Sequence, residues 1–411
     1  MDTLDQHKTA HRFQQKLDIW EPHIHAFTTI CAPKDIARLI GTGPLSGLTV
    51  GIKDIIDVVG LPTRNGSKAF RDAAPAIKDA AVVTALRAAG GLIVGKTTTT
   101  EFAFTDPTAC RNPFDLNRTP GGSSSGSGAA VAAGVVDIAL GTQTAGSLCR
   151  PAAYCGVVGF KPSYGALSNI GVTPLAPSFD SVGIITGSVA RAQAAFAAMA
   201  PRDMNSPIAN PKVTWGLWDS DVIAGTDTLA ALTEAATTCA DLFAATHQRT
   251  LPAEVDQIVA AHRTVMNFEA AMAHGAMLSD HRADLLQPKF RAGLQAGAVI
   301  SADEAAEATD FLAKAKAEFW TGLADVDAVL TLPVPDGPPL IDSTTGYQDW
   351  LTPWTVFGGP LISLPWGLDR LGRPRAVMLA GKPGEDAQLL AIASRLEAQG
   401  PPRPVPQSPK A

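Results

Sequence analysis

The chain has few cysteines, and none of them has the spacing of a metal site. Its five cysteines, Cys31, Cys110, Cys149, Cys155 and Cys239, are odd in number and form no CxxC pair. This usage disfavours a disulfide-stabilised secreted domain and a zinc-binding module. The sequence therefore predicts reduced thiols in a cytoplasmic protein with no metal ion.

Long apolar runs and an excess of positive charge are also missing. No run approaches the roughly 18 residues of a membrane-spanning helix, and the first twenty residues lack a signal-peptide pattern. The net charge is −6, without blocks of like charge, whereas a nucleic-acid partner would require a basic surface. We therefore expect neither a membrane nor a nucleic acid as partner. With 46% hydrophobic and 18% charged residues, the 411-residue chain is predicted to be globular.

Histidine is absent between His25 and His247, a region that contains a conspicuous serine-rich stretch at 121–136. A distant histidine could still complete a Ser-His-Asp triad, because triads assemble in space. No GxSxG nucleophile elbow supports one. Three further histidines lie in a predicted helical region without the i, i+4 spacing of a metal site, and we interpret them as ordinary surface or partly buried side chains: His262, His274 and His281.

Strand-like and helix-like segments alternate along the chain, which indicates an α/β layer architecture. Buried strands are predicted at 92–97, 212–218, 326–335 and 358–368, and helices at 79–90, 225–245, 255–285, 302–322 and 385–398. Residues 1–40 are expected to be helical, with an interruption at Pro22. The polar, proline-containing stretch 201–211 is expected to form a surface connection.

A phosphate-loop pattern, GxxxxGKT, occurs at 90–97 and would indicate a nucleotide-binding protein. That loop requires a strand before it and a helix after it. Here a predicted helix precedes the pattern, and its centre, Leu92-Ile93-Val94, favours a strand. We therefore interpret the stretch as structural.

Lys53 and Ser147 are the first candidates for chemistry. Lys53 lies among apolar residues in VGIKDIIDVVG, and a buried lysine can act as a base because desolvation lowers its pKa. Ser147 ends the turn Thr-Ala-Gly-Ser, whose small residues allow successive backbone N–H groups to converge. A Lys53 that pairs with Asp54 or Asp57, and a plain glycine-containing turn, remain the structural alternatives.

Three ordered segments resemble the signature of the amidase signature family. They are GIKDIIDVVGLPT (51–63), TPGGSSSGSGAAVAAG (119–134) and ALGTQTAGSLCRPAAYCGVVGFKPSYG (139–165). The resemblance implies a single α/β/α sandwich domain with a large mixed, mostly parallel sheet covered by helices on both faces. It places an N-terminal helical segment at 1–43, the signature core at 44–200, the remaining elements of the 1–400 domain at 201–400, and a disordered tail at 401–411.

The resemblance also implies a Ser–Ser–Lys triad that needs no cofactor. The base is Lys53, the middle serine on a cis peptide is Ser123, and the nucleophile is Ser147. The implied oxyanion donors are the backbone N–H groups of Thr144, Ala145, Gly146 and Ser147. By the same resemblance, Asp180 organises backbone around the site.

The residues after the nucleophile are similar to those of the malonamidase-like branch. Gln143 and Arg150 are therefore predicted to contact substrate, with Arg150 holding a carboxylate; the alternative is that Arg150 only braces the loop. The predicted function is hydrolysis of a small, possibly carboxylated, amide. The alternatives are the amidase subunit of a glutamine-dependent amidotransferase, an allophanate or carboxylated-urea hydrolase, and a catalytically silent binding protein. The family resemblance also suggests a homodimer.

Overall fold

A computed structural model describes residues 3–32, 42–200, 207–244, 247–251, 254–341 and 344–409. The strands are β1 (Phe27–Ile30), β2 (Thr49–Lys53), β3 (Leu92–Thr97), β4 (Ile138–Gln143), β5 (Val158–Lys161), β6 (Ser181–Thr186), β7 (Val213–Trp218), β8 (Gln248–Leu251), β9 (Ala328–Thr331), β10 (Leu361–Leu368) and β11 (Pro374–Gly381). They form one sheet in the order β1-β3-β2-β4-β6-β5-β10-β11-β9-β7-β8.

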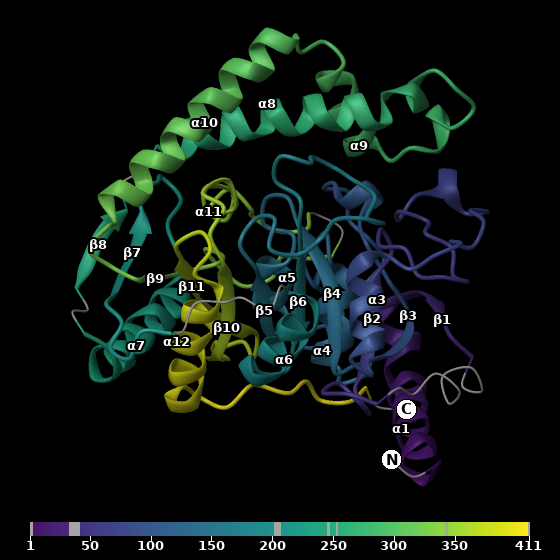
Figure 1. The fold of residues 1–411 in the computed structure, drawn as a ribbon, viewed down its shortest axis with the longest axis horizontal. Helices are drawn as coiled ribbons and strands as arrows, with labels where there is room; N and C mark the ends of the chain where they lie inside the picture. The colour runs from purple at the N-terminus through teal and green to yellow at the C-terminus, as the bar shows by residue number, and fades with distance from the viewer. Residues whose placement is uncertain are drawn as a thin grey trace.

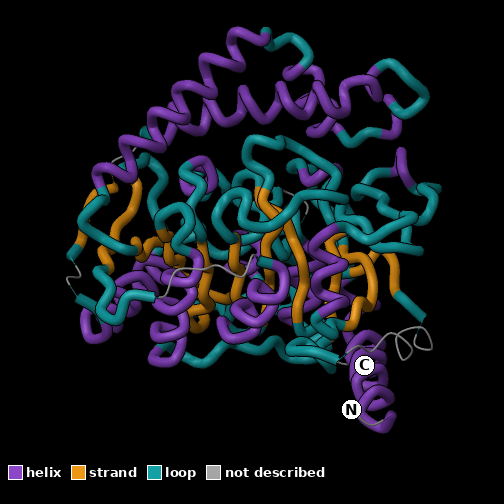
Figure 2. The backbone as a smooth tube through the Cα atoms, viewed as in Figure 1, coloured by secondary structure: helices purple, strands orange, loops and turns teal. Residues whose placement is uncertain are grey.

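Helices cover both faces of this sheet (Figures 1 and 2). The α-helices are α1 (Thr3–Ile24), α3 (Ala81–Ala88), α4 (Ser125–Ala132), α5 (Cys149–Tyr154), α6 (Val189–Met199), α7 (Thr226–Leu242), α8 (Val255–His274), α9 (Pro288–Gly297), α10 (Ala302–Gly322), α11 (Thr352–Val356) and α12 (Asp386–Gln399). Short 3-10 turns are η1 (Lys68–Phe70), η2 (Glu101–Ala103), η3 (Gly275–Leu278) and η4 (Ala283–Leu285). The predicted α/β sandwich with a large mixed sheet is confirmed.

The apolar core has two layers, because the side chains along each strand alternate between the two faces of the sheet. In β4, Ile138 and Leu140 belong to the larger apolar cluster, whereas Ala139 belongs to the smaller one. Helices α3, α6, α7 and α12 pack on the first face, and α4 and α5 pack on the second. Successive side chains of a strand point to opposite faces, so a fully buried strand must be apolar on both.

Small residues allow α4 and α5 to lie unusually close to the sheet. A Cβ on Gly141 would lie 2.7 Å from Ser124 Oγ, and one on Gly159 would lie 2.4 Å from Ala152 Cβ. A Cβ on Gly126 would lie 2.1 Å from the carbonyl oxygen of Ala26. The Gly/Ser/Ala-rich sequence around 121–162 is therefore a close-packing sequence, not a linker.

Three expectations differ from the structure. Antiparallel neighbours outnumber parallel ones in the described sheet, six pairs to four, so the prediction of a mostly parallel sheet is wrong. The helix expected through residue 40 ends at Ile24, because the β-branched run 27–30 pairs with β3; residues 33–41 lie outside the described residues. The tail expected to be disordered has a described conformation through residue 409, and two of its residues, Pro404 and Pro406, are buried against the rest of the protein.

The phosphate-loop pattern forms a strand, as expected. Its lysine, Lys96, lies in the fully buried β3 and forms an ion pair of 3.1 Å with Asp54. A lysine held in this way cannot reach a bound phosphate. The pattern therefore does not support nucleotide binding.

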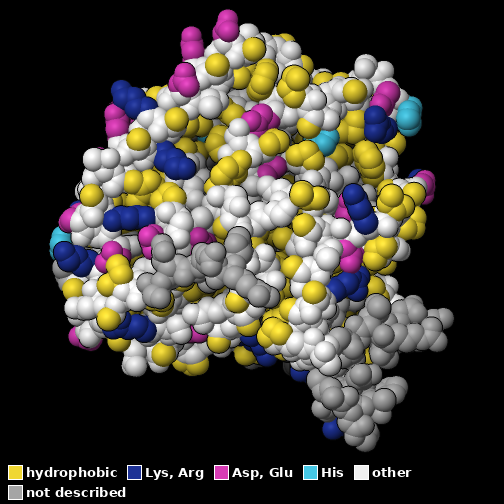
Figure 3. Space-filling model, viewed as in Figure 1, with side chains coloured by type: hydrophobic (Ala, Val, Ile, Leu, Met, Phe, Trp, Pro, Cys, Tyr) yellow, Lys and Arg dark blue, Asp and Glu magenta, His cyan; other side chains and the backbone are white. Residues whose placement is uncertain are grey.

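Helices α8 and α10 pack against each other and lie over the ends of the strands, at the top of the view in Figure 1. No helix among the described residues is long and apolar enough to span a membrane. On the face seen in Figure 3, Lys and Arg side chains of described residues lie apart and do not form one continuous stripe.

Candidate active site

Lys53 is the last residue of β2, an inner strand that lies between β3 and β4, and its side chain is completely buried. Its Nζ lies 2.7 Å from Ser123 Oγ and 2.7 Å from Thr142 Oγ1. The ion pair with Asp54 that served as the structural alternative is not formed, because Asp54 pairs with Lys96. Lys53 is thus a buried amine held between two hydroxyl groups.

Burial lowers the pKa of Lys53 to about 7, and the negative charge of Asp180 partly opposes this shift. Desolvation disfavours the ammonium form because the low-dielectric interior does not solvate its charge. A lysine with a pKa near 7 carries an unprotonated fraction at neutral pH, and only that fraction can accept a proton.

Ser123 follows a cis peptide bond between Gly122 and Ser123, as the family resemblance implied. Its side chain is fully buried at the start of the loop that leads into α4. The next two serines have structural contacts: Ser124 Oγ accepts from Thr142 N (3.2 Å), and Ser125 Oγ donates to Gly121 O (2.6 Å). Only Ser123, of these three serines, contacts the lysine.

Ser147 lies on the turn between β4 and α5, next to the loop of Ser123. The two loops are joined directly, because Ser124 N donates to the carbonyl oxygen of Ser147 at 3.1 Å. Ser147 keeps 5% of its surface exposed, whereas Lys53 and Ser123 keep none. The least buried of the three is therefore the serine predicted to be the nucleophile.

The turn before Ser147 has unpaired backbone donors. The N–H groups of all four predicted donors, Thr144, Ala145, Gly146 and Ser147, donate to no acceptor among the described residues. Buried backbone N–H groups are almost always paired, so four consecutive exceptions indicate a site that receives a ligand. Converging N–H groups of this kind stabilise an oxyanion.

Thr144 begins this turn and is held by Asp180. Thr144 Oγ1 donates to Asp180 Oδ1 (2.5 Å), and Asp180 Oδ2 accepts from Leu175 N (2.8 Å) and Ala176 N (3.0 Å). Burial raises the pKa of Asp180 to about 6. Asp180 therefore organises backbone around the site, as the resemblance implied.

Gln143 has a different environment from the one predicted. Its side chain is buried; Oε1 accepts from Leu148 N and Cys149 N, both at 3.0 Å, and Nε2 donates to Thr355 Oγ1 at 3.0 Å. These bonds occupy both ends of the amide. Gln143 thus holds the start of α5 against α11 and is not placed to contact substrate.

The guanidinium of Arg150 also donates all its hydrogen bonds to other groups of the protein. Nε and Nη2 donate to Gly122 O at 3.1 and 2.6 Å, and Nη1 donates to Gly346 O at 2.6 Å. Longer contacts of 3.3 and 3.4 Å reach Thr345 Oγ1 and Gln348 Oε1. All five guanidinium N–H groups therefore have an acceptor, and none of these acceptors is a carboxylate. The structure supports the alternative in which Arg150 braces the loop of Ser123.

Two residues that contact the turn were not found from the sequence. His262, expected to be at most partly buried, is 3% exposed, and its Nε2 lies 2.8 Å from Thr144 O. Thr355 of α11 donates its hydroxyl to Ala145 O. Both contacts join positions more than a hundred residues apart, so local sequence patterns carry no signal for them.

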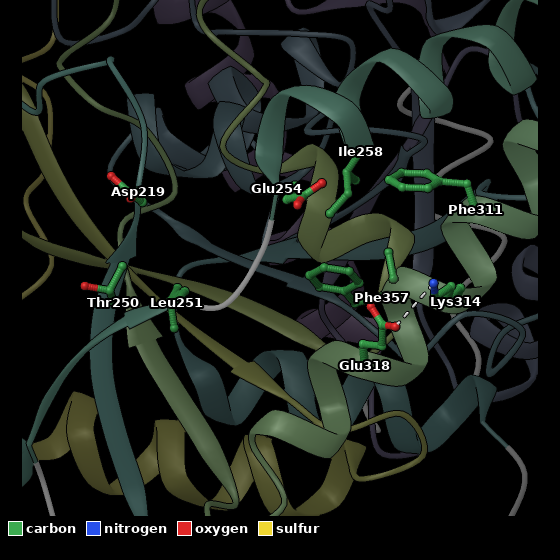
Figure 4. A pocket seen from close by; sticks show the side chains of 10 residues that line it. Asp219, Thr250, Leu251, Glu254, Ile258, Phe311, Lys314, Glu318 and Phe357 are labelled. Carbon is green, nitrogen blue, oxygen red and sulfur yellow. Dashed lines mark ion pairs between the residues drawn. The ribbon is translucent and has the colours of Figure 1, made fainter.

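A separate cavity of about 470 Å³ lies between α10, the start of α8 and the β7–β8 end of the sheet (Figure 4). Ile258, Phe311 and Phe357 supply apolar walls, and Lys314 pairs with Glu318 at 3.8 Å. None of the triad residues lines this cavity. Among the described residues, no cluster of three or more His, Cys, Asp or Glu side chains could hold a metal ion.

Comparison with known proteins agrees with this geometry. The family model described as Amidase matches residues 11–390, and the chain belongs to the amidase family. A solved structure titled as a crystal structure of amidase has a TM-score of 0.84 and 28% identity, covering 98% of this chain and 100% of that one. Another, from a study of a vestigial protein complex and the origins of an s-triazine catabolic enzyme, has a TM-score of 0.88 and 26% identity, covering 97% and 96%.

Curated relatives match a shorter region. A glutamyl-tRNA(Gln) amidotransferase subunit from Halobacterium salinarum is 51% identical over 155 residues, which is 36% of each chain. The matches span between 32% and 42% of the length of such relatives.

Proposed function

We propose that this protein is an amide hydrolase in which Ser147 is the nucleophile and Lys53, acting through Ser123, is the base. The observation that carries the proposal is the 2.7 Å contact between the buried Lys53 Nζ and Ser123 Oγ. Family membership and the unpaired N–H groups of Ala145, Gly146 and Ser147 support it. Together these residues supply a proton acceptor, a relay, a nucleophile and an oxyanion site, so the reaction needs no cofactor.

In the acylation step, Ser147 Oγ attacks the carbonyl carbon of the amide. Its proton passes to Ser123 Oγ, whose own proton passes to the unprotonated Lys53 Nζ. The negative charge that develops on the carbonyl oxygen is stabilised by the backbone N–H groups of the turn.

When the tetrahedral intermediate collapses, the C–N bond breaks and the leaving nitrogen takes a proton through the same relay in reverse. Ammonia or an amine is released, and the acyl group remains as an ester on Ser147. A water molecule then loses a proton to the relay and attacks the ester. Release of the carboxylic acid returns Ser147 to its starting form.

We propose a small amide as substrate, without a carboxylate bound by Arg150. The guanidinium has no N–H group left for a substrate carboxylate, and a bidentate contact would require breaking bonds to Gly122 or Gly346. This modifies the expectation of a carboxylated amide. An allophanate or carboxylated-urea hydrolase is the competing assignment, and a screen of amide substrates separates the two.

A second candidate is the amidase subunit of a glutamine-dependent amidotransferase. The observation that favours it is the 51% identity to a glutamyl-tRNA(Gln) amidotransferase subunit over 155 residues. Such a protein would deliver ammonia to a partner and would hydrolyse simple amides poorly alone.

An ammonia-release assay on the purified protein tests the proposal. The substrates would be acetamide, malonamide, malonamate, allophanate, glutamine and an aryl amide, with Ser147→Ala as the control. Turnover of a small amide without a partner, lost in Ser147→Ala, supports the free hydrolase. Glutamine-specific turnover that requires an added partner would support the amidotransferase assignment.

A further inference from the structure

The peptide planes of the turn before Ser147 are held by hydrogen bonds to their carbonyl oxygens, two of which come from side chains on α8 and α11. In a trans peptide, the carbonyl oxygen of one residue and the N–H of the next point in opposite directions. A donor that holds the carbonyl on one side therefore directs the N–H toward the other side. The three peptides that carry the unpaired N–H groups of Ala145, Gly146 and Ser147 are each held in this way.

The first of these peptides is held by α8. His262 Nε2 lies 2.8 Å from Thr144 O, and the ring of His262 packs on Phe179 with centroids 4.4 Å apart. The carbonyl oxygen can only accept, so Nε2 carries the proton. Burial lowers the pKa of His262 to about 4, and the imidazole is therefore neutral at neutral pH. This peptide also carries the N–H of Ala145.

The second peptide is held by α11. Thr355 Oγ1 donates to Ala145 O and itself accepts from Gln143 Nε2 at 3.0 Å. A second carbonyl, Leu351 O, lies farther away at 3.3 Å, so the single hydroxyl proton is directed to Ala145 O. This peptide also carries the N–H of Gly146.

The third peptide is held within the following helix. Arg150 N donates to Gly146 O at 3.1 Å. The N–H of Ser147 belongs to this peptide and points away from that bond. Two of the three groups that donate to these carbonyl oxygens are therefore side chains, His262 on α8 and Thr355 on α11. Both helices are distant in sequence from the signature segments.

We propose that His262 and Thr355 are positioning residues of the oxyanion hole, acting through the peptides Thr144–Ala145 and Ala145–Gly146. The inference rests on the proposed function, because it assigns a role within that site. Their contribution is made in the transition state, where the oxygen of the substrate carries charge. Removing either donor lets its peptide rotate and misdirects one N–H group. The effect should fall on kcat rather than on KM.

The test uses paired variants of the full chain. Thr355→Val removes the hydroxyl at nearly constant volume, and Thr355→Ser restores it. His262→Leu removes the donor, and His262→Gln supplies an N–H at a similar reach. Thr264→Val is the matched control, since Thr264 is also in α8 and its Oγ1 donates to a backbone carbonyl of the same helix, Ala260 O, at 3.2 Å.

Two readouts are measured on variants that circular dichroism shows to be folded. One is kcat and KM on the best amide of the screen, and the other is the rate at which a fluorophosphonate labels Ser147, whose tetrahedral adduct places an oxygen in the same hole. We expect Thr355→Val and His262→Leu to lower kcat and the labelling rate by about 10- to 1,000-fold. KM should remain within about threefold, Thr355→Ser and His262→Gln should recover most of the loss, and Thr264→Val should change neither rate.

The pH profile separates this role from the proton relay. The acid limb of the profile should stay in place in Thr355→Val, because Lys53 and Ser123 are not touched. Wild-type labelling rates in both Thr355→Val and His262→Leu would overturn the inference while leaving the hydrolase proposal intact. Absence of both turnover and Ser147 labelling in the wild-type protein would instead overturn the proposed function, and the inference with it.

Discussion

Lys53 Nζ and Ser123 Oγ lie 2.7 Å apart in a part of the protein where both side chains are completely buried. Burial of the amine has two consequences that work together. It lowers the pKa of Lys53 to about 7, and it keeps water from competing for the serine hydroxyl. In the proposed mechanism, the same contact would therefore provide both the base and its alignment.

The first prediction concerns pH. Lys53 must be unprotonated to accept a proton, so activity should rise with pH through about 7 and level off above it. A profile of kcat/KM between pH 5 and 9 checks this. Activity that still rises tenfold per pH unit at pH 9, as expected for a lysine with its ordinary pKa of about 10, would contradict the assignment of Lys53 as base.

The second prediction removes the base while keeping its shape. Lys53→Met should lower kcat by about 10²–10⁴-fold, because the proton of Ser147 would have no acceptor through Ser123. Folding should be preserved, because methionine has nearly the length of lysine and the buried carboxylate nearby, Asp180, keeps its hydrogen bonds from Thr144, Leu175 and Ala176. Thr142→Val is the comparison, since Thr142 contacts Lys53 but lies outside the path from Lys53 through Ser123 to Ser147. An equal loss in both variants would argue that Lys53 acts only by packing.

The third prediction concerns Arg150. Arg150→Ala should lower the free energy of unfolding by about 2–4 kcal/mol, because Gly122 O and Gly346 O would lose a charged donor in a buried site. The loss of kcat should be similar for neutral and carboxylated amides, since the guanidinium holds the Ser123 loop and not the substrate. Denaturant unfolding and paired kinetics on malonamide and malonamate measure both effects. A selective rise of KM for malonamate would restore the carboxylate-binding role.

The fourth prediction tests the close packing of the serine-rich helix. Gly126→Ala would place a methyl group 2.1 Å from Ala26 O and 2.4 Å from Thr98 N, both backbone atoms that cannot move aside alone. We expect a loss of about 3 kcal/mol or more in the free energy of unfolding. Gly275→Ala is the control, because nothing lies within 4 Å of its added methyl. Equal melting temperatures for the two variants would show that α4 is free to shift.

The sequence predicted the part of the site that local motifs encode. Lys53, Ser123 and Ser147 each lie in a segment whose residues resemble a family signature, and the structure brings the first two into hydrogen-bond contact. The roles assigned to Gln143 and Arg150 depended on which groups face them across the fold. Those partners, Thr355 and Gly346, are about two hundred residues away.

The same limit explains the missed residues and the sheet. His262 has the sequence context of any histidine on an amphipathic helix, and only the packing of α8 over the turn makes it a donor to Thr144 O. The prediction that most strands are parallel was also wrong, because an apolar run predicts a buried strand but not which strand lies beside it or in which direction that neighbour runs. Strand β5, for example, pairs antiparallel with both β6 and β10.

The last prediction concerns the charge of Asp180. Asp180 raises the pKa of Lys53 by electrostatic attraction to the ammonium form, and its own pKa of about 6 leaves it mostly ionised near pH 7. Asp180→Asn removes this charge and can keep the contacts: the amide oxygen can accept from Leu175 N and Ala176 N, and the amide N–H can donate to Thr144 Oγ1. The pKa of Lys53 should then fall, because the protonated form loses its stabilising neighbour.

The acid limb of the kcat/KM profile should accordingly move to lower pH in Asp180→Asn, with the plateau reduced only modestly. Asp57→Asn offers a control for a change of net charge, since Asp57 is not among the groups that shift the pKa of Lys53. An acid limb that stays in place, or moves to higher pH, would mean that the group titrating in the profile is not Lys53. Burial lowers the pKa of Lys53 and the charge of Asp180 raises it. The shift of the acid limb between wild type and Asp180→Asn therefore measures how much of the desolvation effect on this pKa is offset by the charge of Asp180.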